Sequence, residues 1–166
     1  VKAVGFTGSI TGGRALYDLA ANRKEPIPVF AEMGSVNPVV FLPDALQQRG
    51  ETLAKTYASS VTLGVGQFCT NPGLLLGIKG KSLDHFIEKL AEAIVEIEPG
   101  CMLHPNIIGA YEANKSKAMS QEGIEMVSQY THEVEVNYAR QAVTKVEGST
   151  FMQNTALHQE VFGPFT

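Results

Sequence analysis

The apolar stripe along residues 82–98 is the feature that most constrains how this chain folds. Its apolar side chains recur at the three- and four-residue spacing of one helix face: Leu83, Phe86, Ile87, Leu90, Ala91, Ile94 and Val95. Ser82 is a favourable N-cap, and Pro99-Gly100 ends the helix. A helix with one apolar face packs against another layer, so the stripe predicts a layered domain.

Short apolar runs alternate with helical segments along the rest of the chain. The strand-like runs are 2–6, 26–33, 38–42, 74–78, 134–138 and 141–146. Helical spacing covers 13–21, 44–63 and 106–120. This alternation predicts an α/β fold with three αβα layers around a mostly parallel sheet. In such sheets the functional groups gather on loops at the carboxyl ends of the strands.

Composition limits the class of protein. The 166 residues suffice for a single domain, predicted over 1–166, and 44% of them are hydrophobic. The net charge is −4 and no Lys/Arg cluster is present, so we expect neither a nucleic acid nor a membrane partner. No apolar run approaches the ~20 residues that span a bilayer. Two cysteines form no disulfide framework, which favours a reducing compartment, the cytoplasm.

The two ends of the chain indicate a piece of a longer protein. The chain opens directly in a strand-like run, "VKAVGF", without an initiator Met or a secretion signal. It stops directly after "EVFGPFT", another strand-like run. We therefore expect the 166 residues to be one region of a longer protein.

Cys69 lies in the glycine-flanked stretch "GVGQFCTNPG", which leaves two interpretations open. Free cysteines are usually buried as small apolar side chains. A loop rich in N–H donors is instead the setting in which a thiolate becomes nucleophilic. Cys101, in "PGCMLHP", favours the buried, structural interpretation. The four histidines are scattered, and no spacing of His, Cys, Asp and Glu indicates a metal site.

Three further stretches carry candidate groups. Glu32 ends a strand-like run in "FAEMGSVNP", where it is either a solvated strand end or a general base in a partly apolar pocket. "GFTGSITGG" is a strand, a Gly/Ser turn and a helix, an arrangement that can present N–H groups to an anion. Glu160 and Phe162 in "QEVFGP" would point to one face of a strand.

These four stretches, in this order, resemble the aldehyde dehydrogenase superfamily along essentially the whole chain. The matching positions are Phe6-Thr7-Gly8-Ser9 with Gly13, Glu32 to Pro38, Gly66-Gln67-Phe68-Cys69, and Glu160 to Pro164. The stretches "AEMGSVNPVVFLP" and "TLGVGQFCTNPG" resemble those of the branch that contains 2-oxoglutarate semialdehyde dehydrogenases and NADP-dependent fatty aldehyde dehydrogenases. Asn71-Pro72 stands where many members have Ala-Gly.

The resemblance implies a role for each group. Cys69 would attack the aldehyde to form a thiohemiacetal and then a thioester, and Glu32 would activate the hydrolytic water. The Cys69 backbone N–H would help to hold the oxyanion, together with an Asn that lies upstream in the family. Gly8 and Ser9 would lie near the cofactor, NAD or NADP, with Glu160 on the nicotinamide ribose and Phe162 against the nicotinamide. The fold would be that of an aldehyde dehydrogenase catalytic domain.

The sequence also leads to expectations about the substrate, the oligomeric state and alternative functions. The resemblance implies a small aldehyde substrate, 2-oxoglutarate semialdehyde or alternatively a fatty or other aliphatic aldehyde. It also implies a homo-oligomeric full-length protein. Two alternatives from other classes are a Cys-dependent hydrolase or acyltransferase, which would need no NAD(P), and an α/β interaction domain with an inert cysteine.

Overall fold

The computed structural model describes all 166 residues, which form two compact units, Val1–Ser35 and Val36–Thr166. Helices and strands alternate in both units, so the α/β class is confirmed. The strands pair as four two-stranded ladders, two parallel and two antiparallel. The single domain over 1–166 stays a prediction, and each unit is described separately.

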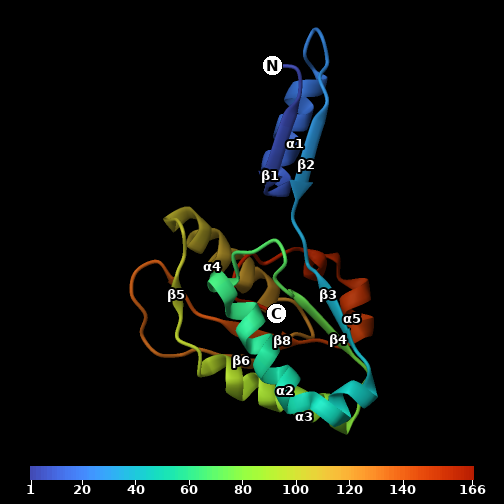
Figure 1. Ribbon diagram of the computed structural model, residues 1–166, viewed down its shortest axis with the longest axis vertical. Coiled ribbons are helices and arrows are strands. Elements are labelled where there is room, and N and C mark those ends of the chain that lie inside the picture. The colour runs from blue at the N-terminus through green and yellow to red at the C-terminus, as the bar shows by residue number, and fades with distance from the viewer. The chain divides into compact units, whose positions relative to one another are not determined.

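The first unit is a strand, a helix and a second strand. Strand β1 (Val4–Gly8) pairs in parallel with β2 (Val29–Met33), and α1 (Ile10–Ala21) connects them and packs on both (Figure 1). Buried Gly13 permits this packing, because a Cβ there would overlap the Met33 side chain. The helix begins three residues before the predicted position, since the Ser9 hydroxyl caps it by accepting a hydrogen bond from the Gly12 N–H, 3.1 Å away.

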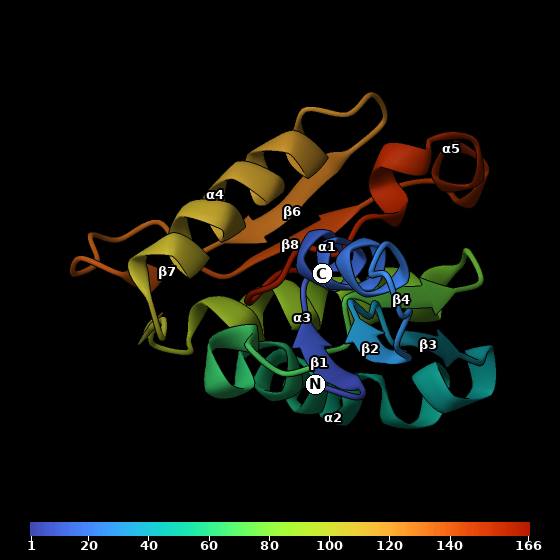
Figure 2. The same cartoon turned by 90° about the horizontal axis from the view of Figure 1, so that it is seen from above.

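The second unit contains the remaining elements. In chain order they are β3 (Pro38–Phe41), α2 (Pro43–Thr62), η1 (Leu63–Gly66), β4 (Leu74–Gly77), α3 (Lys81–Val95), β5 (Gly100–Cys101), α4 (Pro105–Met119), β6 (Glu125–Gln129), β7 (Tyr138–Ala139), β8 (Ala142–Lys145), α5 (Gly148–Gln153) and η2 (Thr155–His158). Strand β3 pairs in parallel with β4. The pairs β5–β7 and β6–β8 are antiparallel, and β6 and β8 appear as neighbouring arrows in Figure 2.

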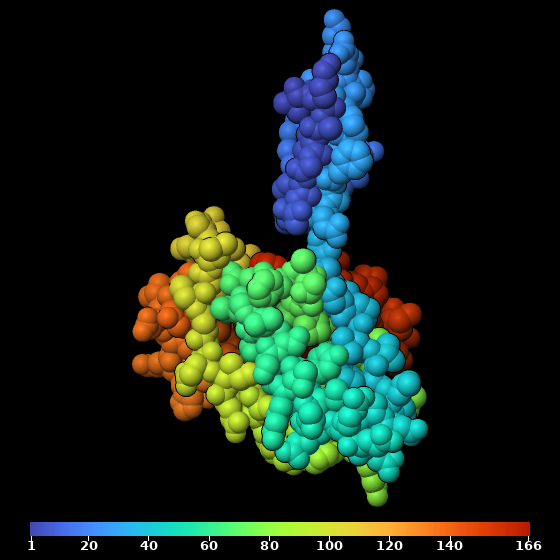
Figure 3. Space-filling model, viewed as in Figure 1, coloured from blue at the N-terminus to red at the C-terminus, as the bar shows by residue number.

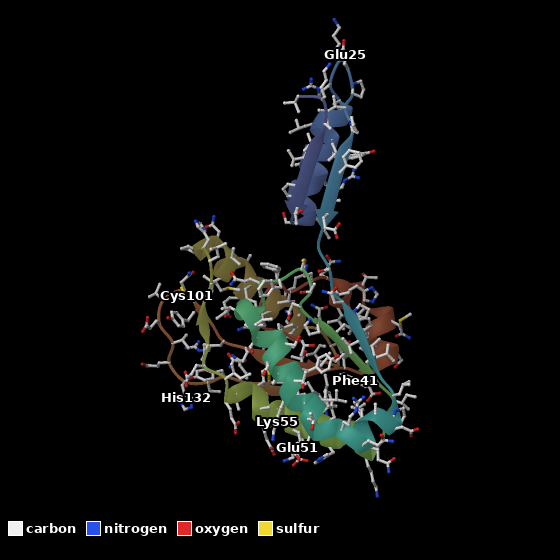
Figure 4. All side chains as sticks on the ribbon, viewed as in Figure 1. Glu25, Phe41, Glu51, Lys55, Cys101 and His132 are labelled. Carbon is white, nitrogen blue, oxygen red and sulfur yellow. The ribbon has the colours of Figure 1, made fainter.

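Two apolar clusters hold the second unit together. In the larger cluster α2 packs along α3, and Phe41 lies against them from β3 (Figure 4). The predicted stripe on α3 supplies Phe86, Leu90 and Ile94, each at most 2% exposed. At about 1.5–3 kcal/mol per buried side chain, this face contributes much of the cohesion of the unit. The smaller cluster contains Met102, Tyr111, Ala139, Ala142 and Phe165.

Several predicted boundaries were wrong for local reasons. Helix α3 begins at Lys81 after Gly80, so Ser82 lies inside the first turn and is not the N-cap. Helix α4 begins after His104, whose ring Nδ1 accepts a hydrogen bond from the Asn106 N–H at 3.1 Å. No strand forms over 134–136, where Val136 is 95% exposed and no neighbouring strand pairs with it.

The strand at Glu125–Gln129 was missed by the sequence pattern. Its pairing with β8 contains an irregularity between Met126 and Ser128, which interrupts the alternation of side chains. The Ser128 hydroxyl donates a hydrogen bond to the Ala91 carbonyl on α3. None of the helices combines the length and the apolar character that crossing a membrane requires.

Candidate active site

In the first unit the parallel ladder brings two of the predicted motifs together. Thr7 lies opposite Glu32, and Gly8 lies opposite Met33. The carboxyl ends of both strands therefore meet at one edge, where Glu32 is exposed and lines an open hollow of about 590 Å³. The Glu32 carboxylate is therefore accessible and lies beside the Phe6–Ser9 motif at the end of β1.

Gly8 and Ser9 lie where β1 passes into α1. The Ser9 hydroxyl and carbonyl accept hydrogen bonds from the Gly12 and Gly13 N–H groups. The earlier N–H groups of the helix, those of Ile10 and Thr11, have no acceptor within the helix, as at every helix N-terminus. They carry the positive end of the helix dipole, which favours an anion.

Cys69 lies in the loop between η1 and β4, and the structure places it at the surface. The thiol residue is exposed, and the green segment that includes this loop lies at the surface of the second unit in Figure 3. The loop follows a tight turn in which Gly64, Val65 and Gly66 all have positive φ. The interpretation of Cys69 as a buried apolar side chain is therefore wrong, and the loop presents it.

The Asn37 side-chain amide and one backbone hydrogen bond hold the Cys69 loop from one side. The Asn37 amide donates to the Cys69 carbonyl at 2.7 Å and to the Asn71 carbonyl at 2.9 Å. The Gly73 N–H donates to the Val36 carbonyl at 3.0 Å. Residues 36–37, which belong to the Glu32–Pro38 motif, therefore hold the Cys69 loop.

The Gly163 turn holds the loop from another side. A Cβ added at Gly66 would overlap the backbone of Gly163 and Pro164, so the two chain segments touch backbone to backbone. The Asn71 amide also donates to the Gly163 carbonyl at 2.9 Å. The structure thus joins the G-Q-x-C and E-x-F-G-P motifs, although the hydrogen-bonded residues Asn71 and Gly163 lie 92 positions apart in the sequence.

The two cofactor candidates in this region differ in exposure. Glu160 is half-buried, whereas Phe162 keeps 37% of its surface exposed directly before buried Gly163 and Pro164. Tyr111 packs against Gly163, and its hydroxyl donates to the Arg140 carbonyl at 2.7 Å. Burial raises the pKa of the Tyr111 hydroxyl well above its ordinary value, so the group remains a neutral donor. The turn that follows Phe162 therefore packs against the Tyr111 ring, which its hydrogen bond to the Arg140 carbonyl holds in place.

Gln67 is a further residue whose contacts the sequence did not predict. Its amide donates to the Gly64 carbonyl at 3.0 Å, and its side-chain oxygen accepts from the Leu103 N–H at 3.0 Å. Gln67 thus links the Cys69 loop to the segment before α4. The only sequence signal for Gln67 was its place inside the G-Q-x-C motif. The motif does not identify Leu103 as its partner, because Leu103 lies 36 positions away.

Cys101 was expected to be buried, and this was wrong. It is exposed in β5 (Figure 4), because the two-residue strand leaves its side chain outside the smaller apolar cluster. Its sulfur lies 3.5 Å from the Asn137 amide nitrogen. Cys101 is therefore a second accessible thiol and a natural control for Cys69.

The histidines have partners of their own. His104 caps α4, His158 contacts the Phe151 carbonyl at 2.8 Å, and His85 lies 3.7 Å from the Glu88 carboxylate. The His132 ring packs edge-on against Tyr130 (His132 is labelled in Figure 4). These contacts lend no support to a Cys–His hydrolase. No group of three or more His, Cys, Asp or Glu side chains is placed to hold a metal ion.

Comparison with known proteins defines the class. The profile of the aldehyde dehydrogenase family matches residues 1–166. The chain belongs to the aldehyde dehydrogenase family.

Particular relatives are similar along the whole chain. The chain is 44% identical over 164 residues to alpha-ketoglutaric semialdehyde dehydrogenase 2 of Azospirillum brasilense, covering 99% of this chain and 31% of that protein. It is 38% identical over 167 residues to alpha-ketoglutaric semialdehyde dehydrogenase of Acinetobacter baylyi, covering 100% of this chain and 32% of that protein. The chain thus spans about a third of the length of these relatives. The resemblance to the semialdehyde dehydrogenase branch is confirmed.

Solved structures confirm the fold. A double mutant of betaine aldehyde dehydrogenase from Staphylococcus aureus, in complex with NAD+, superposes with a TM-score of 0.81 at 20% identity, over 100% of this chain and 34% of that one. An NAD-dependent benzaldehyde dehydrogenase from Corynebacterium glutamicum superposes with a TM-score of 0.77 at 25% identity, over 99% of this chain and 36% of that one. The aldehyde dehydrogenase fold predicted from the motifs is therefore present.

Proposed function

We propose that the whole protein to which this chain belongs oxidises an aldehyde to a carboxylate with NAD or NADP, and that Cys69 is its nucleophile. One observation carries the proposal. Cys69 is exposed on a loop whose backbone packs against the Gly163 turn of the E-x-F-G-P motif, in a chain of the aldehyde dehydrogenase family.

The chemistry assigns a task to each of this chain's groups. The Cys69 thiolate attacks the aldehyde carbon, a C–S bond forms, and the carbonyl oxygen takes up the negative charge. The Cys69 backbone N–H is the donor that this chain offers to that oxyanion. The hydride would then leave that carbon as the acyl thioester forms on Cys69, and NAD(P)+, when bound, would supply the hydride acceptor. Glu32 takes a proton from water as the water attacks the thioester; the C–S bond then breaks and the carboxylate leaves.

The residues present fit a nicotinamide cofactor. The N-terminus of α1, after Gly8 and Ser9, offers N–H donors and a helix dipole to an anionic phosphate group. Phe162 exposes 37% of its surface, so its ring is available to pack against a flat heterocycle. A carboxylate at Glu160 suits the hydroxyl groups of a ribose.

The proposed substrate is 2-oxoglutarate semialdehyde. The two relatives named for alpha-ketoglutaric semialdehyde, the same compound, share 44% and 38% of their aligned residues with this chain. We further propose a homo-oligomer in the cytoplasm, on the basis of family membership.

Substitution of each group in the whole protein tests the assignment. Cys69→Ala abolishes aldehyde-dependent NAD(P)H formation, followed by absorbance, whereas the matched control Cys101→Ala leaves it unchanged. Glu32→Gln lets the acyl-enzyme accumulate, seen as a mass increase of the Cys69 peptide. NAD(P)-independent turnover, or turnover retained in Cys69→Ala, would rule out the proposed function.

A further inference from the structure

The Asn37 side chain spans the nucleophile loop. Its amide nitrogen donates to the Cys69 and Asn71 carbonyls, at 2.7 and 2.9 Å, which uses both of its hydrogens. Asn37 is half-buried and has a φ of 42°, a left-handed conformation that Asn and Gly adopt more readily than other residues. This backbone conformation therefore suits Asn or Gly at position 37.

The Asn71 side chain connects the Cys69 loop to the Gly163 turn. Its amide donates to the Gly163 carbonyl at 2.9 Å, across 92 positions of sequence. Its side-chain oxygen is shielded from solvent and has no hydrogen-bond partner. Within the chain, this amide is therefore held by its donor side. Gly163 directly follows Phe162, the proposed nicotinamide contact.

We propose that Asn37 and Asn71 are positioning residues that act in series, with Asn37 holding the peptide group of Cys69 and Asn71 holding the same loop to the Gly163 turn. This inference rests on the proposed function. The carbonyl of Cys69 and its side chain leave the same Cα, so fixing the peptide plane restricts where the thiol points. A misplacement of about 1 Å at a reacting atom lowers a rate by about 100-fold, which is the scale of the expected effect.

The chain offers a matched control for this arrangement. Asn137 also has a positive φ, 72°, and its amide also donates to a backbone carbonyl, that of Met102. Its side-chain oxygen is likewise shielded and without a partner. Glycine keeps a positive φ without strain, so Asn37→Gly and Asn137→Gly remove the same amide from the same kind of backbone.

The test uses the whole protein, with 2-oxoglutarate semialdehyde and NAD(P)+. For each variant, Cys69 is counted by iodoacetamide labelling and peptide mass spectrometry, and kcat is expressed per labelled Cys69. Asn37→Gly and Asn71→Ala are expected to lower this kcat by about 10- to 100-fold with KM within about threefold. Asn137→Gly is expected to lower the thermal midpoint by a similar amount and to keep kcat within about twofold of wild type.

Each result has a defined meaning. If kcat per labelled Cys69 is unchanged in Asn37→Gly and Asn71→Ala, the two residues only stabilise the fold and the inference is wrong. A loss in only one of them refutes the serial arrangement, and an equal loss in Asn137→Gly refutes positioning. A wild-type protein without NAD(P)-dependent turnover, or activity that survives Cys69→Ala, refutes the proposed function instead.

Discussion

Replacing Gly66 by alanine tests the contact that joins the Cys69 loop to the Gly163 turn. Gly66 has a φ of 65°, which L-residues with a Cβ adopt at a cost of about 1–2 kcal/mol. The added Cβ would lie 2.5 Å from the Pro164 nitrogen, whereas real Cβ contacts essentially never fall under 3.0 Å. The loop and the turn must therefore move apart.

The size of the effect follows from these two costs. Overpacking of this kind costs about 1–3 kcal/mol, so together with the backbone strain Gly66→Ala lowers the free energy of unfolding by about 2–5 kcal/mol. An ordinary contact lies at 3.4–4 Å, so restoring one from 2.5 Å requires a movement of about 1–1.5 Å. Because Cys69 lies three residues along the same loop, a displacement of that size lowers kcat by about 10- to 100-fold.

The assay compares Gly66→Ala with Gly109→Ala in the whole protein. Gly109 lies in α4 with nothing within 4 Å of an added Cβ, so alanine there stabilises the helix by about 0.5–1 kcal/mol. Urea unfolding measures stability, and NAD(P)H formation measures kcat. If Gly66→Ala unfolds at the wild-type urea concentration and keeps the wild-type kcat, the backbone contact between loop and turn is not formed in solution.

Three further predictions concern hydrogen bonds that the side chains of Tyr111, Gln141 and Ser9 make. Tyr111→Phe lowers stability by about 1–3 kcal/mol, because the Arg140 carbonyl loses its 2.7 Å donor and keeps only the longer contact from the Lys115 ammonium at 3.4 Å. The pKa of the Tyr111 hydroxyl is raised in the folded state, so the folded protein keeps this proton at a pH at which the unfolded chain loses it. The stability of the wild-type protein, measured by urea unfolding, therefore falls as the pH rises above about 10. An equally steep fall in Tyr111→Phe would contradict this. Gln141→Leu removes the buried donor to the Ile94 carbonyl and costs about 1–3 kcal/mol; wild-type hydrogen exchange at the end of α3 would count against it. Ser9→Ala costs about 1 kcal/mol through the lost cap and speeds exchange in residues 10–21, whereas Ser9→Asp restores protection; identical exchange in both variants refutes the cap.

The helical stripe shows what local pattern predicts well. Phe86, Leu90 and Ile94 recur every four residues, and this spacing alone assigns them to one face, which the structure buries. Boundaries were less predictable. Gly80 rather than Ser82 precedes α3, and His104 caps α4, because end positions depend on small local energies that neighbouring residues can also satisfy.

Residues that act through distant partners escaped the sequence pattern. Asn37 and Asn71 look like ordinary turn residues until their partners, 32 to 92 positions away, are known. The strand at 125–129 was missed for a related reason, since its pairing with β8 contains an irregularity that breaks the alternation. Pairing across such distances is decided by the folded chain as a whole.

The amino-acid sequence by itself determined the four ordered motifs, the aldehyde dehydrogenase resemblance and the apolar face of α3, because these depend on residue identity and short spacing. The tertiary structure alone decided that Cys69 is exposed and that its loop is held by Asn37 and the Gly163 turn. The physical reason is that a hydrogen bond between an amide and a carbonyl, or a backbone contact that excludes a Cβ, exists only once distant segments have been brought together.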